Sequence, residues 1–161
     1  MRIISGTWRL RPLIAPNCDT TRPTADRTRE TLFSMLTSRL GSFEGLQVLD
    51  LFSGSGALGL EALSRGAAHC VFVEQDKAAL DALETNIAKL GAGPQSEIKR
   101  GSALMLGPAR KAYDLILLDP PYGTGAGAVA LDKLSRLGWV ASGALVSIET
   151  GNREDTVVKG F

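Results

Sequence analysis

The sequence has 161 residues, of which 44% are hydrophobic and 22% are charged, and its formal net charge is +1. This length suffices for one packed domain, and the composition is that of a globular chain rather than a disordered one. The apolar runs are too short to span a bilayer, and the amino-terminal residues do not have the pattern of a secretory signal. Cys18 and Cys70 form neither a metal-ligand pattern nor a disulfide framework, so we expect a cytoplasmic protein with reduced thiols and no metal.

The first 40 residues read as an extension that precedes the main domain. Short extended segments around Gly6 predict a hairpin, and a loop rich in turn-forming residues follows at 16–23. Thr24 is then a suitable N-cap for a helix that Gly41 ends, since apolar residues recur at helical spacing between these positions.

This extension is basic. All seven of its basic residues are arginines, and its net charge is +4, whereas residues 41–161 carry −3. Guanidinium groups bind phosphates and stack on bases, so the extension is either a polyanion-binding arm or an ordinary solvated basic face. The candidates for contact with nucleic acid are Arg2, Arg9, Arg11, Arg22, Arg27 and Arg29.

From residue 46 onward, short apolar runs alternate with amphipathic segments. The runs at 48–52, 70–73, 96–99, 113–118 and 144–148 predict strands, and the segments at 57–65, 77–90 and 129–137 predict helices. Apolar strands that alternate with helices are typical of a parallel sheet covered on both faces. We therefore expect one α/β domain over 1–161, made of the extension at 1–40 and a core at 41–161.

A glycine-rich turn follows the first predicted strand, in the sequence Asp-Leu-Phe-Ser-Gly-Ser-Gly at 50–56. Gly54 and Gly56 allow the backbone to turn sharply and a ligand to approach it. Glu74 ends the next strand, 20 residues after Gly54, where a carboxylate can accept hydrogen bonds from both hydroxyls of a ribose. With Gly59, the turn also satisfies the dinucleotide fingerprint, so by itself it fits a nicotinamide cofactor as well as an adenosyl one.

Together with Asp50, this turn resembles motif I of the class I methyltransferases, in which the acid holds the amino-acid end of S-adenosylmethionine. Ser102 and Ala103 follow the third strand, where that superfamily often places an acid and a backbone amide beside the adenine. The serine departs from that pattern. The residues expected to bind the cofactor are Asp50, Phe52, Ser53, Gly54, Gly56, Glu74, Gln75, Ser102 and Ala103.

The strand at 113–118 runs into the candidate catalytic residues Asp119, Pro120, Pro121 and Tyr122. The prolines fix φ and remove two N–H donors, so the chain leaves the carboxyl edge of the sheet on a rigid course with Asp119 in the ligand crevice. An exocyclic base amine is a poor nucleophile, because its lone pair is delocalised into the ring. Hydrogen bonds to the Asp119 carboxylate and the Pro120 carbonyl would localise that lone pair and aim it at a sulfonium methyl. Tyr122 would stack on the base, which must be unpaired or flipped out.

Several segments closely resemble the RsmD family of bacterial methyltransferases: Arg2-Ile3-Ile4-Ser5-Gly6, Arg9-x-Arg11-x-Leu13, residues 22–33, residues 54–66 and the tetrapeptide at 119–122. The resemblance implies a Rossmann-like class I fold, S-adenosylmethionine as cofactor, and methylation at N2 of a guanine in 16S ribosomal RNA. It also implies a small ribosomal subunit, or an assembly intermediate of it, as the partner, with the arginines of the extension on RNA. The fold usually finishes with an antiparallel strand pair. Val157-Val158 reads like the start of its first strand, and we expect the closing pair to be missing from this chain.

Other functions stay open on the residues alone. A DNA adenine or cytosine amino-methyltransferase uses the same pocket chemistry, although 161 residues leave no room for a separate target-recognition domain. An RNA-binding assembly factor would keep the fold without turnover, and the presence of Asp119 and Glu74 argues against it. Only the glycine turn supports a nicotinamide-dependent enzyme.

Overall fold

The computed structural model describes residues 1–16, 23–120, 125–149 and 155–159. Its centre is a six-stranded sheet with the strand order β3-β2-β1-β4-β5-β6. The strands are β1 (Gln47–Leu51), β2 (His69–Glu74), β3 (Ser96–Arg100), β4 (Tyr113–Leu118), β5 (Val140–Glu149) and β6 (Asp155–Lys159). Strands β1 to β5 are parallel, and β6 pairs antiparallel with β5. The expected parallel α/β sheet is confirmed.

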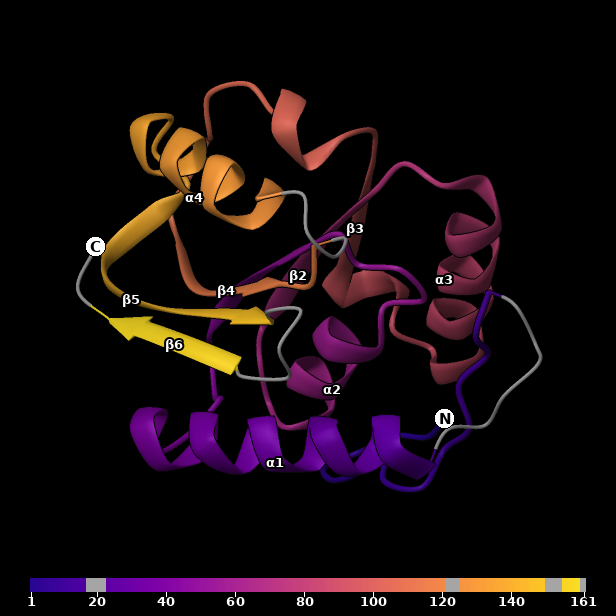
Figure 1. Ribbon diagram of the computed structural model, residues 1–161. Coiled ribbons are helices and arrows are strands. Elements are labelled where there is room, and N and C mark those ends of the chain that lie inside the picture. The colour runs from indigo at the N-terminus through magenta and orange to yellow at the C-terminus, as the bar shows by residue number, and fades with distance from the viewer. Residues whose placement is uncertain (17–22, 121–124, 150–154, 160–161) are drawn as a thin grey trace.

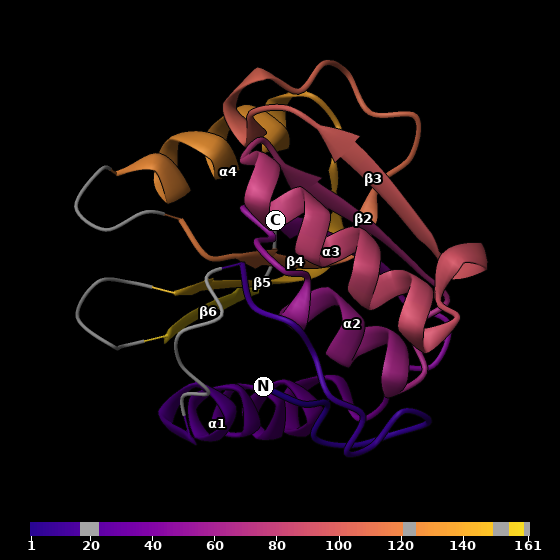
Figure 2. The ribbon, with the colours of Figure 1, turned by 90° about the vertical axis from the view of Figure 1, so that its right-hand side faces the viewer.

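Helices cover both faces of this sheet (Figure 1). Helices α1 (Pro23–Leu40), α2 (Ala57–Ser64) and α3 (Lys77–Leu90) pack on one face, and α4 (Ala126–Arg136) packs on the other. Figure 2 shows α2 between the sheet and α1, so that side of the protein is two helices deep. Buried Phe33 and Leu36 of α1 lie in the same core cluster as Val48 and Leu115 of the strands, so the extension shares its core with the main domain.

Two short 3₁₀ helices, η1 (Gly93–Gln95) and η2 (Ala103–Met105), flank β3 and were not expected from the sequence. Within the described part of the chain, no helix combines the length and apolar character that a membrane span needs. In the same residues, no cluster of three or more His, Cys, Asp or Glu side chains could hold a metal ion. Cys70 is a free, buried thiol.

Several element boundaries differ from the expected ones. Helix α1 begins at Pro23, so the expected N-cap Thr24 lies inside the helix. Strand β1 ends at Leu51, and Phe52 lies outside it with a φ of 55°. Helix α4 begins at Ala126 rather than at residue 129, because Gly125 precedes it in the left-handed conformation that starts the turn. Strand β5 begins at Val140 rather than at residue 144, and its pairing with β4 shifts register near its start.

The two ends of the chain also differ from expectation. The amino-terminal hairpin contains a single bridge between Arg2 and Pro12, with the Ile3 N–H donating to the Arg11 carbonyl at 2.9 Å. At the other end, residues 157 and 158 lie in β6, as expected for a strand. We expected both closing strands to be missing. For β6 this expectation is wrong, because β6 pairs antiparallel with residues 145–149 of β5.

Candidate active site

The carboxyl ends of the parallel strands surround a crevice of about 340 Å³, a volume that suits a small organic ligand. This is the edge at which open α/β sheets bind their ligands, because the strand order reverses there between β1 and β4. The crevice is lined by Phe52, Val73, Glu74, Gln75, Asp76, Gly101, Ala103, Asp119 and Pro120. Most of these residues belong to the expected site, whereas Val73, Asp76 and Gly101 were not anticipated.

The glycine turn reverses the chain between β1 and α2. Phe52, Gly54 and Gly56 all have positive φ angles, of 55°, 56° and 85°. A Cβ on Gly56 would lie 2.4 Å from Leu83 Cδ1, and other residues rarely adopt its φ of 85°, so this position favours glycine. Phe52 is held in a conformation that costs a non-glycine residue about 1 kcal/mol or more, and such strain is concentrated at ligand-binding sites.

Two buried polar atoms at the turn have no hydrogen-bond partner among the described residues. Asp50 is fully buried, and its Oδ2 accepts the Gly59 N–H at 2.9 Å, while its Oδ1 has no partner. Ser53 Oγ is the second such atom. Because buried polar groups are nearly always hydrogen-bonded, these two atoms indicate a polar ligand group or water beside the turn.

The electrostatics at Asp50 support the same conclusion. Burial raises the pKa of the Asp50 carboxyl well above its usual range, and the negative charges of Asp119 and Glu74 raise it further, although the Gly59 N–H lowers it. Three carboxyl groups therefore act on one small region. A cation placed there would lower the energy of all three ionised groups.

Glu74 joins the end of β2 to the glycine turn. Its Oε1 accepts the Gly54 N–H at 2.8 Å, and its Oε2 accepts the N–H groups of Gln75 and Asp76 at 3.1 and 2.9 Å. The Asp76 side chain in turn caps α3 by accepting the Ala79 N–H at 3.0 Å. A carboxylate has about four lone-pair positions, so Glu74 keeps acceptor capacity toward the crevice that it lines.

Ser102 and Ala103 play different parts at the wall beyond β3. The Ser102 hydroxyl accepts the Leu104 N–H at 3.1 Å and thereby caps η2. Buried Ala103 forms part of the crevice wall. Of this expected pair, the structure therefore places Ala103 in the crevice lining and Ser102 beside it.

Asp119 and Pro120, at the end of β4, line the same crevice as Glu74. The Asp119 N–H approaches the Leu51 carbonyl at 3.4 Å, which ties the end of β4 to the end of β1. The Asp119 side chain is exposed, and Pro120 is half-buried against Gly127 of α4. Pro121 and Tyr122, the other two expected catalytic residues, lie outside the described residues.

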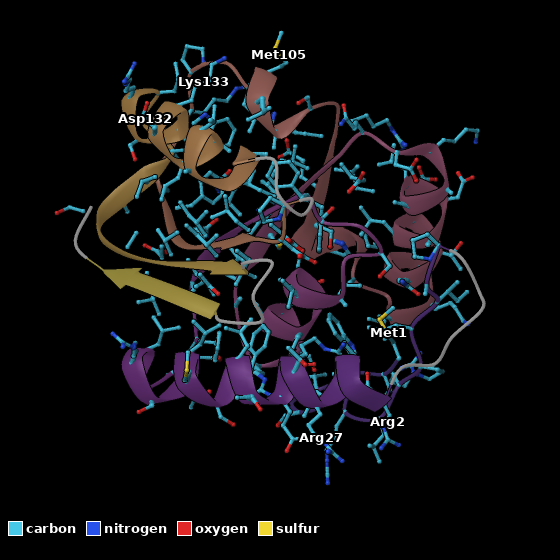
Figure 3. All side chains as sticks on the ribbon, in the orientation of Figure 1. Met1, Arg2, Arg27, Met105, Asp132 and Lys133 are labelled. Atoms are coloured by element: carbon cyan, nitrogen blue, oxygen red, sulfur yellow. The ribbon has the colours of Figure 1, made fainter. Side chains whose placement is uncertain are left out.

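The arginines of the extension fall into two groups. Arg2, Arg9, Arg11 and Arg27 are exposed, and Figure 3 shows Arg2 and Arg27 projecting from the same end of the protein, away from the sheet. Arg29 is only 4% exposed, because it pairs with Asp26 at 3.0 Å and lies 3.7 Å from Glu61, and it donates to the Arg2 carbonyl. The structure thus gives Arg29 an internal role and does not present it to a nucleic acid. Arg22 lies outside the described residues.

Sequence reasoning missed several buried polar residues that fasten the amino-terminal arm, which we define as residues 1–16, to the core, among them Glu61 and Asn86. Glu61 in α2 accepts the backbone N–H groups of Ile4 and Ser5 at 2.8 and 3.1 Å. Asn86 in α3 bonds to the backbone of Ile14. In the sequence, either residue could be recognised only as a polar side chain on the helix face that the spacing of the apolar residues predicts to be buried.

Comparisons with known proteins agree with this geometry. The family model described as conserved hypothetical protein 95 matches residues 1–160. Ribosomal RNA small subunit methyltransferase D of Escherichia coli (strain K12) is 39% identical over 150 residues, which cover 93% of this chain and 74% of that protein. The protein of the same name from Haemophilus influenzae is 38% identical over 154 residues, which cover 93% of this chain and 78% of that protein.

Solved structures give the same result. The structure of yhhF from Escherichia coli superposes with a TM-score of 0.81 at 40% sequence identity, covering 93% of this chain and 80% of that one. The Thermus protein TTHA0928 superposes with a TM-score of 0.79 at 27% sequence identity, covering 99% of this chain and 98% of that one. Because the family model spans nearly the whole sequence and the relatives are similar over most of their length, the chain belongs to the RsmD family of methyltransferases.

Proposed function

We propose that the protein transfers a methyl group from S-adenosylmethionine to the exocyclic N2 of a guanine in small-subunit (16S) ribosomal RNA. The observation that carries this proposal is the crevice that Phe52 of the glycine turn and Glu74 line together with Asp119 and Pro120. The similarity to proteins named ribosomal RNA small subunit methyltransferase D supports ribosomal RNA as the substrate.

The residues present fit the cofactor. The unpartnered Asp50 Oδ1 and Ser53 Oγ suit its charged amino-acid end, and the acceptor position that Glu74 keeps suits a hydroxyl of its ribose. Gln75 and Ala103 line the wall where its base would lie. S-adenosylmethionine, when bound, supplies a methyl group on a positively charged sulfur, and the carboxyl groups of Glu74 and Asp119, which line the crevice, favour such a cation.

The reacting amine is prepared by Asp119 and Pro120. The Asp119 carboxylate accepts one N–H of the base amine and the Pro120 carbonyl accepts the other, so the nitrogen lone pair is localised and its direction is fixed. When the nitrogen gains the methyl group it must lose a proton, which the Asp119 carboxylate accepts. Because Asp119 is exposed, this proton then passes to water. We assign the stacking of the base to Tyr122.

The arm, through Arg2, Arg9 and Arg11, and helix α1, through Arg27, supply the contact with RNA in this proposal. Arg2, Arg9, Arg11 and Arg27 are exposed, and guanidinium groups bind phosphates bidentately. A guanine inside a helix cannot reach the crevice, so the target must be unpaired or flipped out of its stack. We expect the substrate to be the small ribosomal subunit or an intermediate of its assembly, in the cytoplasm.

The proposal is tested by identifying the methylated product. The protein is incubated with S-adenosylmethionine labelled on its methyl group and, separately, with naked 16S RNA, small-subunit particles and plasmid DNA, and the polymers are then digested to nucleosides. We expect label in N2-methylguanosine from RNA or from particles. Label in DNA, or in any other nucleoside, would overturn the assignment.

The role of Asp119 is tested by Asp119→Ala. We expect cofactor affinity to stay near the wild-type value while kcat falls by about 10²–10³, the usual loss when one catalytic hydrogen-bonding group is removed. Asp132→Ala is the matched control, because Asp132 is an exposed carboxylate on α4 whose only described ion pair is with Arg136. If Asp119→Ala turns over at the wild-type rate, Asp119 does not activate the amine.

A further inference from the structure

One buried side chain touches both the amino-terminal arm and the cofactor turn. Asn86 of α3 is fully buried. Its Oδ1 accepts the Ile14 N–H at 2.8 Å, and its Nδ2 donates to the Ile14 carbonyl and to the Ser55 carbonyl, each at 3.0 Å. Ser55 lies between Gly54 and Gly56, so one amide group links the arm to the middle of the glycine turn.

These three hydrogen bonds resist separate movement of the arm and the turn. Both amide hydrogens of Asn86 are used, and its oxygen is used as well. A shift of Ile14 or Ser55 would leave a buried carbonyl or N–H group unpaired, which costs about 1–3 kcal/mol. In the low-dielectric interior the bonds also strengthen one another. Ordering one of the two segments therefore favours the order of the other.

We propose that Asn86 is a positioning residue that couples RNA binding by the arm to cofactor binding at the turn. The inference rests on the proposed function, because it takes the arm as the RNA contact and the turn as the cofactor site. RNA on Arg9 and Arg11 orders the arm as far as Ile14, and Asn86 then holds the Ser55 carbonyl in the conformation that binds the cofactor. By linkage, the cofactor favours RNA binding by the same factor.

Ser64 also fastens the arm, but its described side-chain bonds do not include the turn, so it provides the control. Ser64 at the end of α2 accepts the Trp8 N–H at 3.0 Å and donates to the Ser5 carbonyl at 2.6 Å. Ser64→Ala removes two arm contacts and leaves the bond between Asn86 and Ser55 intact. A loss of coupling caused by a loosened arm alone would appear in both variants.

The experiment measures the dissociation constant of S-adenosylhomocysteine, which cannot react, in the absence and presence of saturating in vitro transcribed 16S RNA. We expect RNA to tighten binding to the wild type by about fivefold or more, the lower end of ordinary coupling between sites. Asn86→Asp keeps the acceptor for the Ile14 N–H but loses both donors. The ratio of its dissociation constant without RNA to that with RNA should therefore fall to about one. Ser64→Ala should keep the wild-type ratio.

A measurement on the wild type keeps the test decisive if the Asn86 variant does not fold. Hydrogen exchange at the Ile14 amide should slow when S-adenosylhomocysteine binds, although this amide belongs to the arm. A wild-type ratio of one, an unchanged Ile14 amide, or equal losses in the two variants would each overturn the coupling. Failure of the wild type to bind either ligand would instead overturn the proposed function.

Discussion

Glu61→Ala tests whether α2 holds the arm and α1 together. The Glu61 carboxylate is fully buried and accepts the N–H groups of Ile4 and Ser5, and it pairs with Arg65 at 2.9 Å and with Arg29 at 3.7 Å. Its removal leaves two backbone donors unpaired and leaves the buried Arg29 with Asp26 as its remaining described carboxylate partner. Breaking a buried ion pair from one side costs about 3–5 kcal/mol. Since domains of this kind are stable by about 5–15 kcal/mol, we expect a protein that still folds but melts about 10 °C lower.

The free energy of unfolding is measured by urea denaturation for Glu61→Ala, Glu61→Gln and Glu84→Ala. Glu61→Gln keeps the shape of the side chain and one acceptor oxygen, so it should lose less stability than the alanine variant. Glu84 forms an exposed ion pair with Arg100, and its removal should cost about 1 kcal/mol or less. If Glu61→Ala costs no more than Glu84→Ala, the buried network does not hold the arm and our reasoning about it is wrong.

Two further predictions concern the arm and the cofactor site. Gly6→Ala should strongly lower the melting temperature, because its Cβ would lie 1.9 Å from the Ser64 carbonyl oxygen. The control Gly45→Ala, also at positive φ but in open space, should lower the melting temperature only through backbone strain. Equal losses of melting temperature in the two variants would contradict this. Asp50→Asn should weaken cofactor binding yet stabilise the fold at pH 7, because a folded-state pKa raised by burial makes the wild type lose stability as the pH rises above the unfolded value of about 3.9. Urea denaturation from pH 3 to 8 should show that the variant's free energy of unfolding, relative to that of the wild type, increases as the pH rises above about 3.9. A difference that decreases with pH would refute the direction assigned to the Asp50 pKa.

The sequence predicted an element best where its ends are encoded by neighbouring residues. Both ends of the helix at 77–90 were predicted correctly, and in the structure Asp76 caps its first turn and Gly91 ends it in the left-handed conformation. The start of β5 was missed because residues 140–143 lack an apolar run, and the strand forms there through pairing with β4. Pairing between strands is tertiary structure, which local periodicity does not contain.

The same distinction applies to the site. The sequence could predict that Asp119, Glu74 and Phe52 of the glycine turn lie at one crevice, because each belongs to a local motif at the end of a strand. Asn86 was not found, because its partners Ile14 and Ser55 lie 72 and 31 residues away. Arg29 was expected on RNA because it lies in a basic segment, yet Asp26 and Glu61 bind it inside the protein.

The division of the sequence into an extension at 1–40 and a core at 41–161 does not correspond to two mechanical units. Glu61 and Ser64 join the arm to α2, the helix that follows the glycine turn, and Asn86 joins it to that turn directly. Binding free energy gained from a large substrate raises the rate only if it is used to position the reacting groups. In an RNA methyltransferase much of that free energy comes from phosphate contacts far from the reacting amine. Buried hydrogen bonds from the arginine-bearing arm to the cofactor turn are a short route by which such contacts can act on the crevice. Our two proposals therefore treat the RNA contact and the methyl-transfer site as parts of one cooperative unit.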